Sequence, residues 1–278
     1  MAEEIVLYLT HKIDKWVIKE FNNLKDTAGG RQVILLYHGE YDGQLPTPNF
    51  CFSDEDLWEL GYPTMGGSLI PGQTHFPLFR YFKEKNNSAD YYWVVEYDVR
   101  FTGEWSYLFD SFQESAADWI SSLIRTYVQH PQWDWWELNH PTKYITKENR
   151  LASFNPIYRV SRKAIKFLDG AFLDGWKGHF EVSVPTLLNY EEFELQDFGG
   201  NGKFVKGRKN IFYINFGFLN HLYEFGTFRY RPIIDSAGLL KNKLYHPVKP
   251  ESDAGLIRKL KYFRYRIYRR YGNDGKLF

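Results

Sequence analysis

Two short apolar runs, separated by an amphipathic segment, open the chain. Residues 4–10 and 32–38 are rich in aliphatic residues and Tyr, which is typical of buried strands. Residues 14–25 between them place three apolar side chains on one face of a helix: Val17, Phe21 and Leu24. Because a strand, a helix and a strand at this spacing form a βαβ unit, we expect a parallel sheet in this part of the chain.

The longest apolar and aromatic run begins at Tyr91 and predicts a central strand covered on both faces. Glu96 and Asp98 stand two residues apart at its C-terminal end, so both carboxylates leave the strand on one face. Open α/β sheets bind ligands just beyond this end. Burying two acids is costly unless their charge is offset, for example by a divalent cation that bridges to a phosphate. The alternative is structural, with Asp98 paired to Arg100 or capping the next turn.

The remaining pattern predicts further helices and strands, with turns where Pro and Gly gather over residues 41–73. Helices are expected over residues 74–85, 105–112 and 161–168, and from about Pro185 onward. Strands are expected over residues 119–127, 151–160, 211–216 and 227–231, with an extended segment over 244–249. Residues 1–250 contain no repeat, low-complexity stretch or clear linker and are predicted to form one α/β domain.

The composition is that of a soluble globular protein, apart from its aromatic content. Hydrophobic residues make up 44% and charged residues 25% of the chain, while aromatic residues reach 19%. Aromatic rings stack on sugars and bases, which favours a carbohydrate or nucleotide ligand, although a core rich in Phe and Tyr explains the same figure. The single cysteine, Cys51, excludes an internal disulfide and a cysteine-built zinc site. No signal peptide and no membrane-spanning run is visible, so a cytoplasmic protein is expected.

Residues 251–278 form a basic tail. Between Leu256 and Phe278 there are eight Lys or Arg residues and one acid, which leaves 27 basic and 33 acidic residues elsewhere. An apolar stripe at helical spacing predicts an amphipathic helix: Leu256, Leu260, Phe263 and Ile267. Such helices lie on anionic membranes or nucleic acid, or dock on an acidic body.

Several common catalytic motifs are missing from the sequence. It has no His-Glu-x-x-His zinc motif, no Gly-x-Ser-x-Gly elbow, and no Gly-x-Gly-x-x-Gly after the first strand. Residues 199–203 lack the first glycine and the Ser or Thr of a phosphate loop, and predict a hairpin turn. Glu181 is either a general base or a favourable acid at the start of a helix. His246 and Lys249 are either a metal ligand and a phosphate-neutralising charge, or surface residues.

Four segments together resemble a known family. They are the strand-helix-strand opening, the run Tyr-Tyr-Trp-Val-Val-Glu-Tyr-Asp-Val-Arg-Phe-Thr-Gly-Glu-Trp from Tyr91, the His-Phe-Glu-Val-Ser-Val-Pro-Thr segment from His179, and a late His-Pro-Val-Lys. The chain from Ile5 to about Lys249 resembles GT-A-type nucleotide-sugar glycosyltransferases, in particular a loosely characterised group from bacteria, fungi and algae and their viruses. The resemblance implies a single GT-A-like domain, with a central, mostly parallel twisted sheet flanked by helices.

The resemblance also implies roles for individual residues. Asp98 is the main ligand of Mn²⁺ or Mg²⁺, Glu96 occupies the first acidic position, and His246 completes the metal site. The sequence reads Glu-Tyr-Asp where the family usually has Asp-x-Asp. In metal-independent relatives, basic residues neutralise the diphosphate, and Arg100 and Lys249 are the candidates here.

The family resemblance also assigns a catalytic base and a loop that meets the nucleotide. Glu181 matches the catalytic base of inverting members, and the first loop meets the nucleotide through Thr10, His11 and Asp14. Four residues are predicted to contact the sugars: Trp105, Trp136, Trp176 and His179. Trp136 belongs to residues 130–137, which are either a sugar-stacking flap or a hydrophobic patch that closes the core.

The sequence therefore predicts a glycosyltransferase that uses a nucleotide-sugar donor, expected to be UDP-linked, and a glycan or glycolipid acceptor. The resemblance of Glu181 to the base of inverting members implies transfer with inversion. Glycosyl transfer in general needs a stabilised diphosphate leaving group, which a cation supplies, and a base for the acceptor hydroxyl. Since many such enzymes use lipid-linked acceptors, the basic tail is expected to contact a membrane peripherally, and no nucleic acid is expected. The alternatives are a glycoside hydrolase with a carboxylate pair and a non-catalytic carbohydrate-binding protein.

Overall fold

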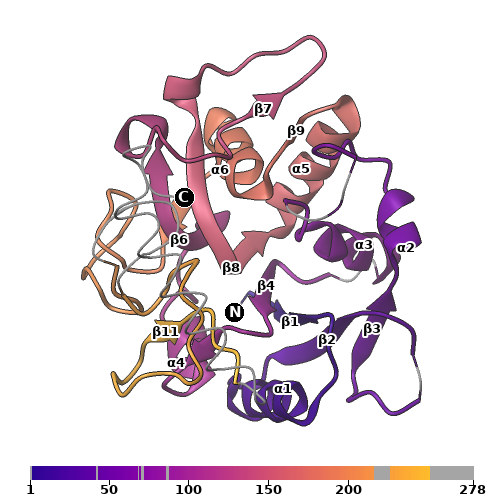
Figure 1. The fold of residues 1–278 in the computed structure, drawn as a ribbon, viewed down its shortest axis with the longest axis vertical. Coiled ribbons are helices and arrows are strands. Elements are labelled where there is room, and N and C mark those ends of the chain that lie inside the picture. The colour runs from indigo at the N-terminus through magenta and orange to yellow at the C-terminus, as the bar shows by residue number, and fades with distance from the viewer. Residues whose placement is uncertain are drawn as a thin grey trace, which may run out of the picture.

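A computed structural model describes residues 2–41, 43–67, 69, 72–85, 88–215 and 226–250. A seven-stranded sheet runs through its centre in the order β10-β6-β8-β4-β1-β2-β3 (Figure 1). The strands of this sheet are β1 (Glu4–Thr10), β2 (Gln32–His38), β3 (Asn49–Phe52), β4 (Tyr91–Glu96), β6 (Trp119–Thr126), β8 (Leu151–Ser161) and β10 (Leu195–Asp197).

Six of these strands run in one direction, and β8 alone runs against its neighbours. The strands β1, β2, β3 and β4 pair in parallel, as do β6 and β10, whereas β8 pairs antiparallel with both β4 and β6. The prediction of one α/β domain with a mostly parallel sheet is thereby confirmed.

The opening βαβ unit forms as its pattern predicts. Helix α1 (Lys15–Thr27) follows β1, and its buried residues are the three of the predicted stripe: Val17, Phe21 and Leu24. The carboxylate of Asp14 begins the helix because it accepts hydrogen bonds from the backbone N–H groups of Trp16 (2.9 Å) and Val17 (2.8 Å). The chain then returns through β2, which lies parallel to β1.

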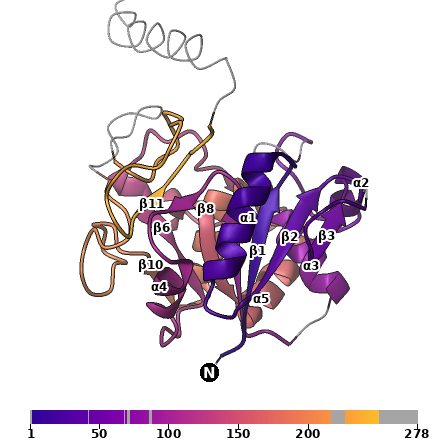
Figure 2. The ribbon, with the colours of Figure 1, turned by 90° about the horizontal axis from the view of Figure 1, so that it is seen from below.

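Helices cover both faces of the sheet, which is why β1, β2 and β4 are mostly apolar. Ile5 and Leu7 point to one face, packed by α2 (Asp54–Trp58), α3 (Phe76–Lys85), α5 (Arg162–Asp174) and α6 (Phe180–Tyr190). Val6 and Tyr8 point to the other, packed by α1 and α4 (Trp105–Asp110), as Figure 2 shows. The alternation has the period of two expected of a strand.

Three segments differ from their sequence prediction. The turn-rich residues 41–73 also contain β3 and α2. Helix α5 continues past Gly170 to Asp174 and ends at Gly175, whose φ of 115° is left-handed. Helix α6 begins at Phe180 rather than near Pro185, which lies inside it. In α5 and α6 burial of the apolar residues outweighs a local helix-breaking signal.

The predicted strands over residues 211–216 and 227–231 are wrong for the residues described. These segments make only isolated bridges, between Asn215 and Gly226 and between Phe228 and His246, and Phe216 lies outside the described residues. The short strands β5 (Arg100–Phe101) and β11 (Leu244–Tyr245) pair antiparallel, as do β7 (Leu138–Asn139) and β9 (Lys177–Gly178). Two 3₁₀ turns, η1 (Tyr127–Gln129) and η2 (Lys147–Asn149), complete the elements.

The predicted basic helix within residues 251–278 lies outside the described residues, so it and the boundary at residue 250 stay predictions. In the part of the chain that the structure describes, no helix has both the length and the apolar character needed to cross a membrane.

Candidate active site

The parallel strands β1, β2, β3 and β4 end at one edge of the sheet, and a cavity of about 410 Å³ opens there. We call it the carboxyl-edge cavity. Its lining comes from the ends of these strands, from α2 and α3, and from the segment before α3: Leu9, Thr10, His11, His38, Phe52, Asp54, Leu57, Leu69, Gln73, Thr74, Pro77, Glu96, Tyr97, Asp98 and Lys249. This is the edge at which open α/β sheets bind ligands.

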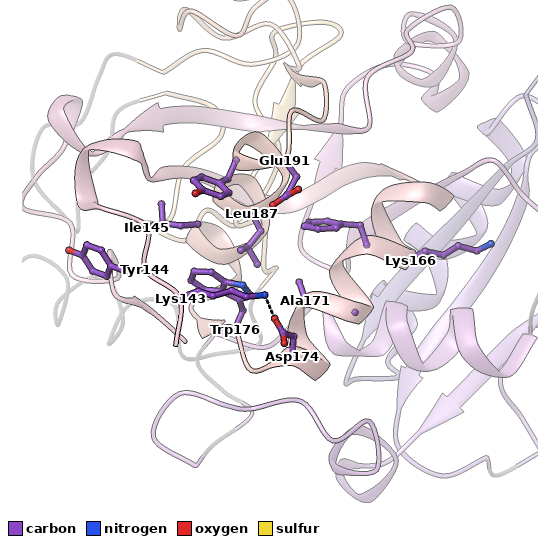
Figure 3. A pocket seen from close by; sticks show the side chains of 12 residues that line it. Lys143, Tyr144, Ile145, Lys166, Ala171, Asp174, Trp176, Leu187 and Glu191 are labelled. Carbon is purple, nitrogen blue, oxygen red and sulfur yellow. Dashed lines mark hydrogen bonds and ion pairs between the residues drawn. The ribbon is translucent and has the colours of Figure 1, made fainter. Parts of the chain in front are cut away.

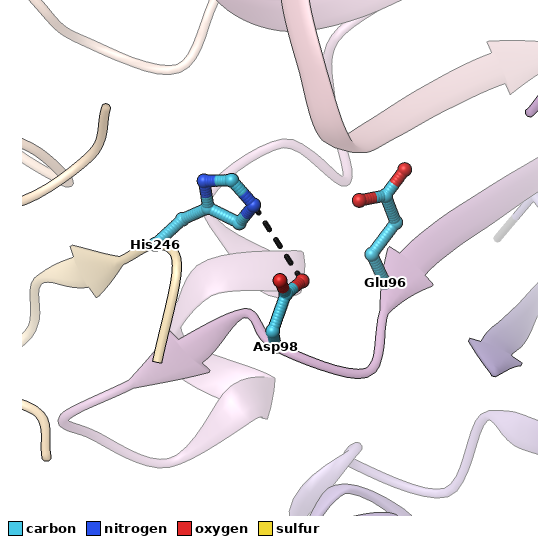
Figure 4. A group of neighbouring side chains, drawn as sticks. All are labelled: Glu96, Asp98 and His246. Carbon is cyan, nitrogen blue, oxygen red and sulfur yellow. Dashed lines mark ion pairs between the residues drawn. The ribbon is translucent and has the colours of Figure 1, made fainter. Parts of the chain in front are cut away.

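Three candidate metal ligands meet beside this cavity, and two of them, Glu96 and Asp98, line it. Glu96 ends β4, Asp98 follows two residues later, and His246 comes from the segment after β11 (Figure 4). One ligand atom from each residue lies within 4.8 Å of the other two. The structure therefore brings together the three residues predicted as metal ligands.

Backbone pairing holds His246 in place. Strand β11 pairs with β5, and the N–H of Val248 donates to the carbonyl oxygen of Asp98 at 2.8 Å. The imidazole Nδ1 lies 2.7 Å from the carbonyl oxygen of Arg229, which accepts its proton. As a result Nε2 faces Asp98, with 3.5 Å between Nε2 and Oδ1. Fixing one ring nitrogen in this way orients the other as a ligand.

The charges in this cluster perturb one another. Burial, together with the charge of Asp98, raises the pKa of Glu96 to about 8. Burial alone would also raise the pKa of Asp98, but the positive charges of His246 and Lys249 hold it well below its usual value. The ammonium of Lys249 lies 3.0 Å from Oδ2 of Asp98 and lines the cavity. Asp98 thus pairs with His246 and Lys249, and not with Arg100.

The donor set fits a divalent cation. Two carboxylates and one imidazole suit Mn²⁺ or Mg²⁺ better than a metal that prefers thiolates. Oδ1 of Asp98 is buried and accepts no hydrogen bond within the described ranges, and Nε2 of His246, itself a candidate ligand, lies 3.5 Å from it. The spacing of up to 4.8 Å is close to the separation of about 4.2 Å between opposite ligands at about 2.1 Å from Mg²⁺.

The first loop contributes to the cavity through two of its three predicted residues. Thr10 and His11 line the cavity, and the ring of His11 packs edge-on against Tyr97 at 5.0 Å. The hydroxyl of Thr10 binds the backbone of Lys12 as both donor and acceptor, which fixes the turn. Asp14 does not line the cavity and instead caps α1.

Glu181 lies in the first turn of α6, with only 14% of its side chain exposed. The N–H of Phe180 donates to the carbonyl oxygen of Gly72 at 2.9 Å, which ties this turn to the Gln73–Thr74 wall of the cavity. The charge of Glu181 is also close enough to Glu96 to help raise its pKa. Glu181 thus approaches the metal-ligand cluster although it does not line the cavity.

Arg100 does not face the carboxyl-edge cavity. Its guanidinium lies 3.8 Å from the ring centre of Trp16, and Nε is 3.3 Å from a carboxylate oxygen of Glu20. Nη1 donates to the carbonyl oxygens of Tyr97 (2.9 Å) and Val99. Of the two basic residues predicted to neutralise a diphosphate, the structure brings only Lys249 to the cavity.

The four predicted sugar contacts do not gather at the carboxyl-edge cavity. Trp105 is buried in α4 against Phe101 and Phe109, at 5.6 Å from each. Trp136 is buried and donates to the carbonyl oxygen of His130, so residues 130–137 form a packed patch at this point.

The other two predicted sugar contacts also lie apart. His179 accepts a hydrogen bond from the N–H of Glu181 and stacks on Trp135 at 5.2 Å. Trp176 lines a different cavity, near the other end of α6.

Among the lining residues that sequence reasoning missed are His38, Phe52 and Asp54. The ring of His38 stacks on Phe52, with 5.1 Å between centroids and 8° between planes, and Nε2 of His38 lies 3.0 Å from a carboxylate oxygen of Asp54. These residues present a flat ring surface and an acid at the ends of β2 and β3. The place of His38 at the end of a predicted parallel strand was the available signal.

Comparisons with known proteins give the fold type only. No protein-family model matches the chain, and no curated protein does. Solved structures similar to it include a glycosyltransferase involved in the glycosylation of the major capsid of PBCV-1 (8% identity, TM-score 0.31), with 62% of this chain matched to 64% of that one.

Two further similar structures come from bacteria. One is glucosyl-3-phosphoglycerate synthase from Mycobacterium tuberculosis in complex with Mn²⁺ and UDP-glucose (12% identity, TM-score 0.40, 75% of this chain, 72% of that one). The other is 4-diphosphocytidyl-2C-methyl-D-erythritol synthase from Anaerococcus prevotii (9% identity, TM-score 0.39, 74% of this chain, 92% of that one). Scores this low assign no activity, substrate or residue role to the chain.

Proposed function

We propose that this protein is a glycosyltransferase that moves a sugar from a nucleotide-sugar donor to a hydroxyl group of a glycan. The observation that carries the proposal is the cluster of Glu96, Asp98 and His246 within 4.8 Å, beside a cavity on the carboxyl edge of the sheet. A site for a divalent cation beside a cavity with room for a nucleotide suits chemistry that begins with a diphosphate.

The same cluster would hold the leaving group. A bound Mn²⁺ or Mg²⁺ would neutralise charge on the departing diphosphate. Asp98, Glu96 and His246 would hold that ion. Lys249, which is two-thirds buried and already faces Asp98, would add a fixed positive charge that needs no reorganisation when the bond breaks.

The nucleotide would lie against the ends of β1 and β2. Thr10 and His11 border the cavity there, and His38 stacked on Phe52 offers a flat surface for a base. Asp54 and the cavity-facing polar groups supply acceptors for ribose hydroxyls. A UDP-linked donor is the proposal, as the sequence resemblance implies.

Glu181 would act as general base. Its carboxylate is mostly buried, lies in the first turn of α6, and is electrostatically coupled to Glu96. It would take the proton from the acceptor hydroxyl as that oxygen attacks the anomeric carbon, opposite the departing diphosphate, with inversion. A base in this role contributes about 10²–10⁴-fold to the rate.

Thermal unfolding with a panel of nucleotide sugars, with and without Mn²⁺, tests the proposal. A donor at about 100 times its Kd adds about 2.7 kcal/mol to the free energy of unfolding. We expect UDP-sugars with Mn²⁺ to stabilise the unsubstituted (parent) protein. The Asp98→Asn variant should lose the portion of this stabilisation that depends on Mn²⁺. Glu181→Gln should keep donor binding but lose transfer.

Other outcomes would contradict the proposal. Cleavage of an oligosaccharide without any nucleotide sugar would indicate a glycoside hydrolase. Unchanged ligand affinity in Asp98→Ala, together with no turnover by the parent, would indicate a non-catalytic binding protein. Full transfer activity in Glu181→Gln would remove Glu181 as the base.

A further inference from the structure

A second cavity, of about 700 Å³, lies between α5 and α6. We call it the α5–α6 groove. Its lining is Lys143, Tyr144, Ile145, Lys166, Phe167, Gly170, Ala171, Asp174, Trp176, Leu187, Tyr190 and Glu191. In Figure 3, Ala171, Leu187 and Trp176 lie in its middle, while Tyr144 and Lys166 stand on opposite sides. None of these residues lines the carboxyl-edge cavity.

A glycine inside helix α5 lines the groove. Gly170 belongs to α5, where glycine is less favourable than alanine because it gives up more conformational freedom. A Cβ added at Gly170 would meet no atom within 4 Å, so packing does not require the missing side chain. The neighbouring residue Ala171 is also small. A side chain longer than a methyl group at residue 170 would therefore extend into the open space beside the groove lining.

Aromatic rings also line the groove. Tyr144 and Tyr190 are 72% and 56% exposed, although burial of a Tyr ring is favourable. Trp176 is buried at the base of the groove and is held by the ring of His140 at 4.9 Å. Exposed flat rings beside a fixed indole suit a ligand with apolar faces of its own.

The charges around the groove balance. Lys143 pairs with Asp174, which also lies 3.2 Å from Nε2 of His140. Lys166 and Glu191 form no ion pair with any described residue and are available to a ligand. With two positive and two negative side chains, the groove attracts neither a phosphate nor a strongly charged peptide. It offers both donors and acceptors to a neutral ligand, which matches the hydroxyl groups of a sugar.

The groove also lies at a useful distance from the proposed base. Glu181 is in the first turn of α6, whereas Leu187, Tyr190 and Glu191 are at its end. Nine helical steps of 1.5 Å separate Glu181 from Tyr190, which is about 14 Å along the axis. A chain of a few sugars can span this distance.

We propose that the α5–α6 groove binds an acceptor oligosaccharide through sugars remote from the one that reacts. This inference rests on the proposed function for its biological meaning. Binding energy from such remote sugars would hold the reacting hydroxyl near Glu181 and so favour transfer to long acceptors. The ligand class is a neutral oligosaccharide.

Binding of four neutral hexasaccharides by calorimetry tests the inference: cellohexaose, maltohexaose, mannohexaose and xylohexaose. We expect at least one to bind the parent and the corresponding monosaccharide to bind far more weakly. Gly170→Gln, which fills the groove while improving helix propensity, should weaken that binding at least about tenfold, and Tyr190→Ala should weaken it similarly. Gly170→Ala is the matched control, since it gains the same backbone restriction but adds only a methyl group, and should bind like the parent.

The result is separable from the fate of the proposed function. Asp98→Asn should bind the hexasaccharide as the parent does, because the groove and the carboxyl-edge cavity share no residue. Nucleotide-sugar binding should be unchanged in Gly170→Gln. Absence of binding by every hexasaccharide, or equal binding by the parent and Gly170→Gln, would overturn the inference. So would a dimeric parent that becomes monomeric in Gly170→Gln, because the groove would then be an interface between two copies of the chain.

Discussion

His75 makes the stability of the fold sensitive to acid. Its ring is 2% exposed and lies among Phe76, Phe79, Phe172 and Phe180, stacked on the last at 5.5 Å with 9° between the planes. Neither ring nitrogen has a hydrogen-bond partner among the described residues. Burial lowers the pKa of His75 from 6.5 to about 3, and the neighbouring His179 acts in the same direction.

The sign and size of the effect follow from proton linkage. Below about pH 6.5 the unfolded chain binds a proton at this histidine, whereas the folded chain does so only near pH 3. Between these values the unfolded state holds one more proton, so the free energy of unfolding decreases as the pH falls. The free energy of unfolding falls by about 1.36 kcal/mol for each pH unit below about 6.5. At about pH 5 the loss due to His75 alone is therefore about 2 kcal/mol.

The variant His75→Phe isolates this contribution. Phenylalanine suits a cage of four Phe rings and removes two unpaired polar atoms, so at about pH 7 the variant should be at least as stable as the parent. In urea denaturation, the parent should lose about 2 kcal/mol more than the variant between about pH 7 and about pH 5. Phe79→Leu in the same cage is the control. It should lower the free energy of unfolding by the same amount at both pH values. Equal losses in the parent and His75→Phe would refute the reasoning.

Three further substitutions probe other parts of the molecule. Arg159→Met should cost about 3–5 kcal/mol in urea denaturation, because the fully buried guanidinium binds Glu4 and three backbone carbonyl groups; retained stability would contradict this. Asp197→Ala should cost about 3 kcal/mol by the same assay, since its carboxylate accepts from three backbone N–H groups and the hydroxyl of Tyr213. Lys249→Met should weaken nucleotide-sugar binding about tenfold in calorimetry, and unchanged affinity would exclude a diphosphate contact.

The sequence predicts those elements whose pattern is set locally. The strands β1, β2 and β4 are apolar because both sheet faces are covered, and α1 carries a regular stripe behind the cap Asp14. Helix α6 is an exception, because its local pattern predicts the wrong start. Pro185 locally signals a helix start, yet five residues before it already belong to the helix, where burial of Val182 and Val184 outweighs the missing N–H.

The site residues also differ in whether a local sequence pattern predicts them. Glu96 and Asp98 follow from the sequence because both stand at the C-terminal end of one apolar run, although the strand itself ends at Glu96 and Asp98 lies in the turn after it. The sequence left two interpretations of His246 open, and only the family resemblance placed it beside Asp98, since its approach depends on the pairing of β5 with β11 and two-residue strands leave no pattern in a sequence. The four predicted sugar contacts rested on aromatic content, and no strand or helix pattern limited where these residues would lie. Trp105 and Trp136 are buried by packing, which composition alone does not distinguish from a ligand surface.

The route by which His246 reaches Asp98 sets the order in which the centre can assemble during synthesis. The sheet edge that carries both acids is complete in sequence long before β11 has been translated. Until Leu244 and Tyr245 leave the ribosome and pair with Arg100 and Phe101, a nascent chain has the two acids at that edge without the imidazole of His246. Even with its sheet formed, such a chain would lack one of the three ligands that we propose for the cation.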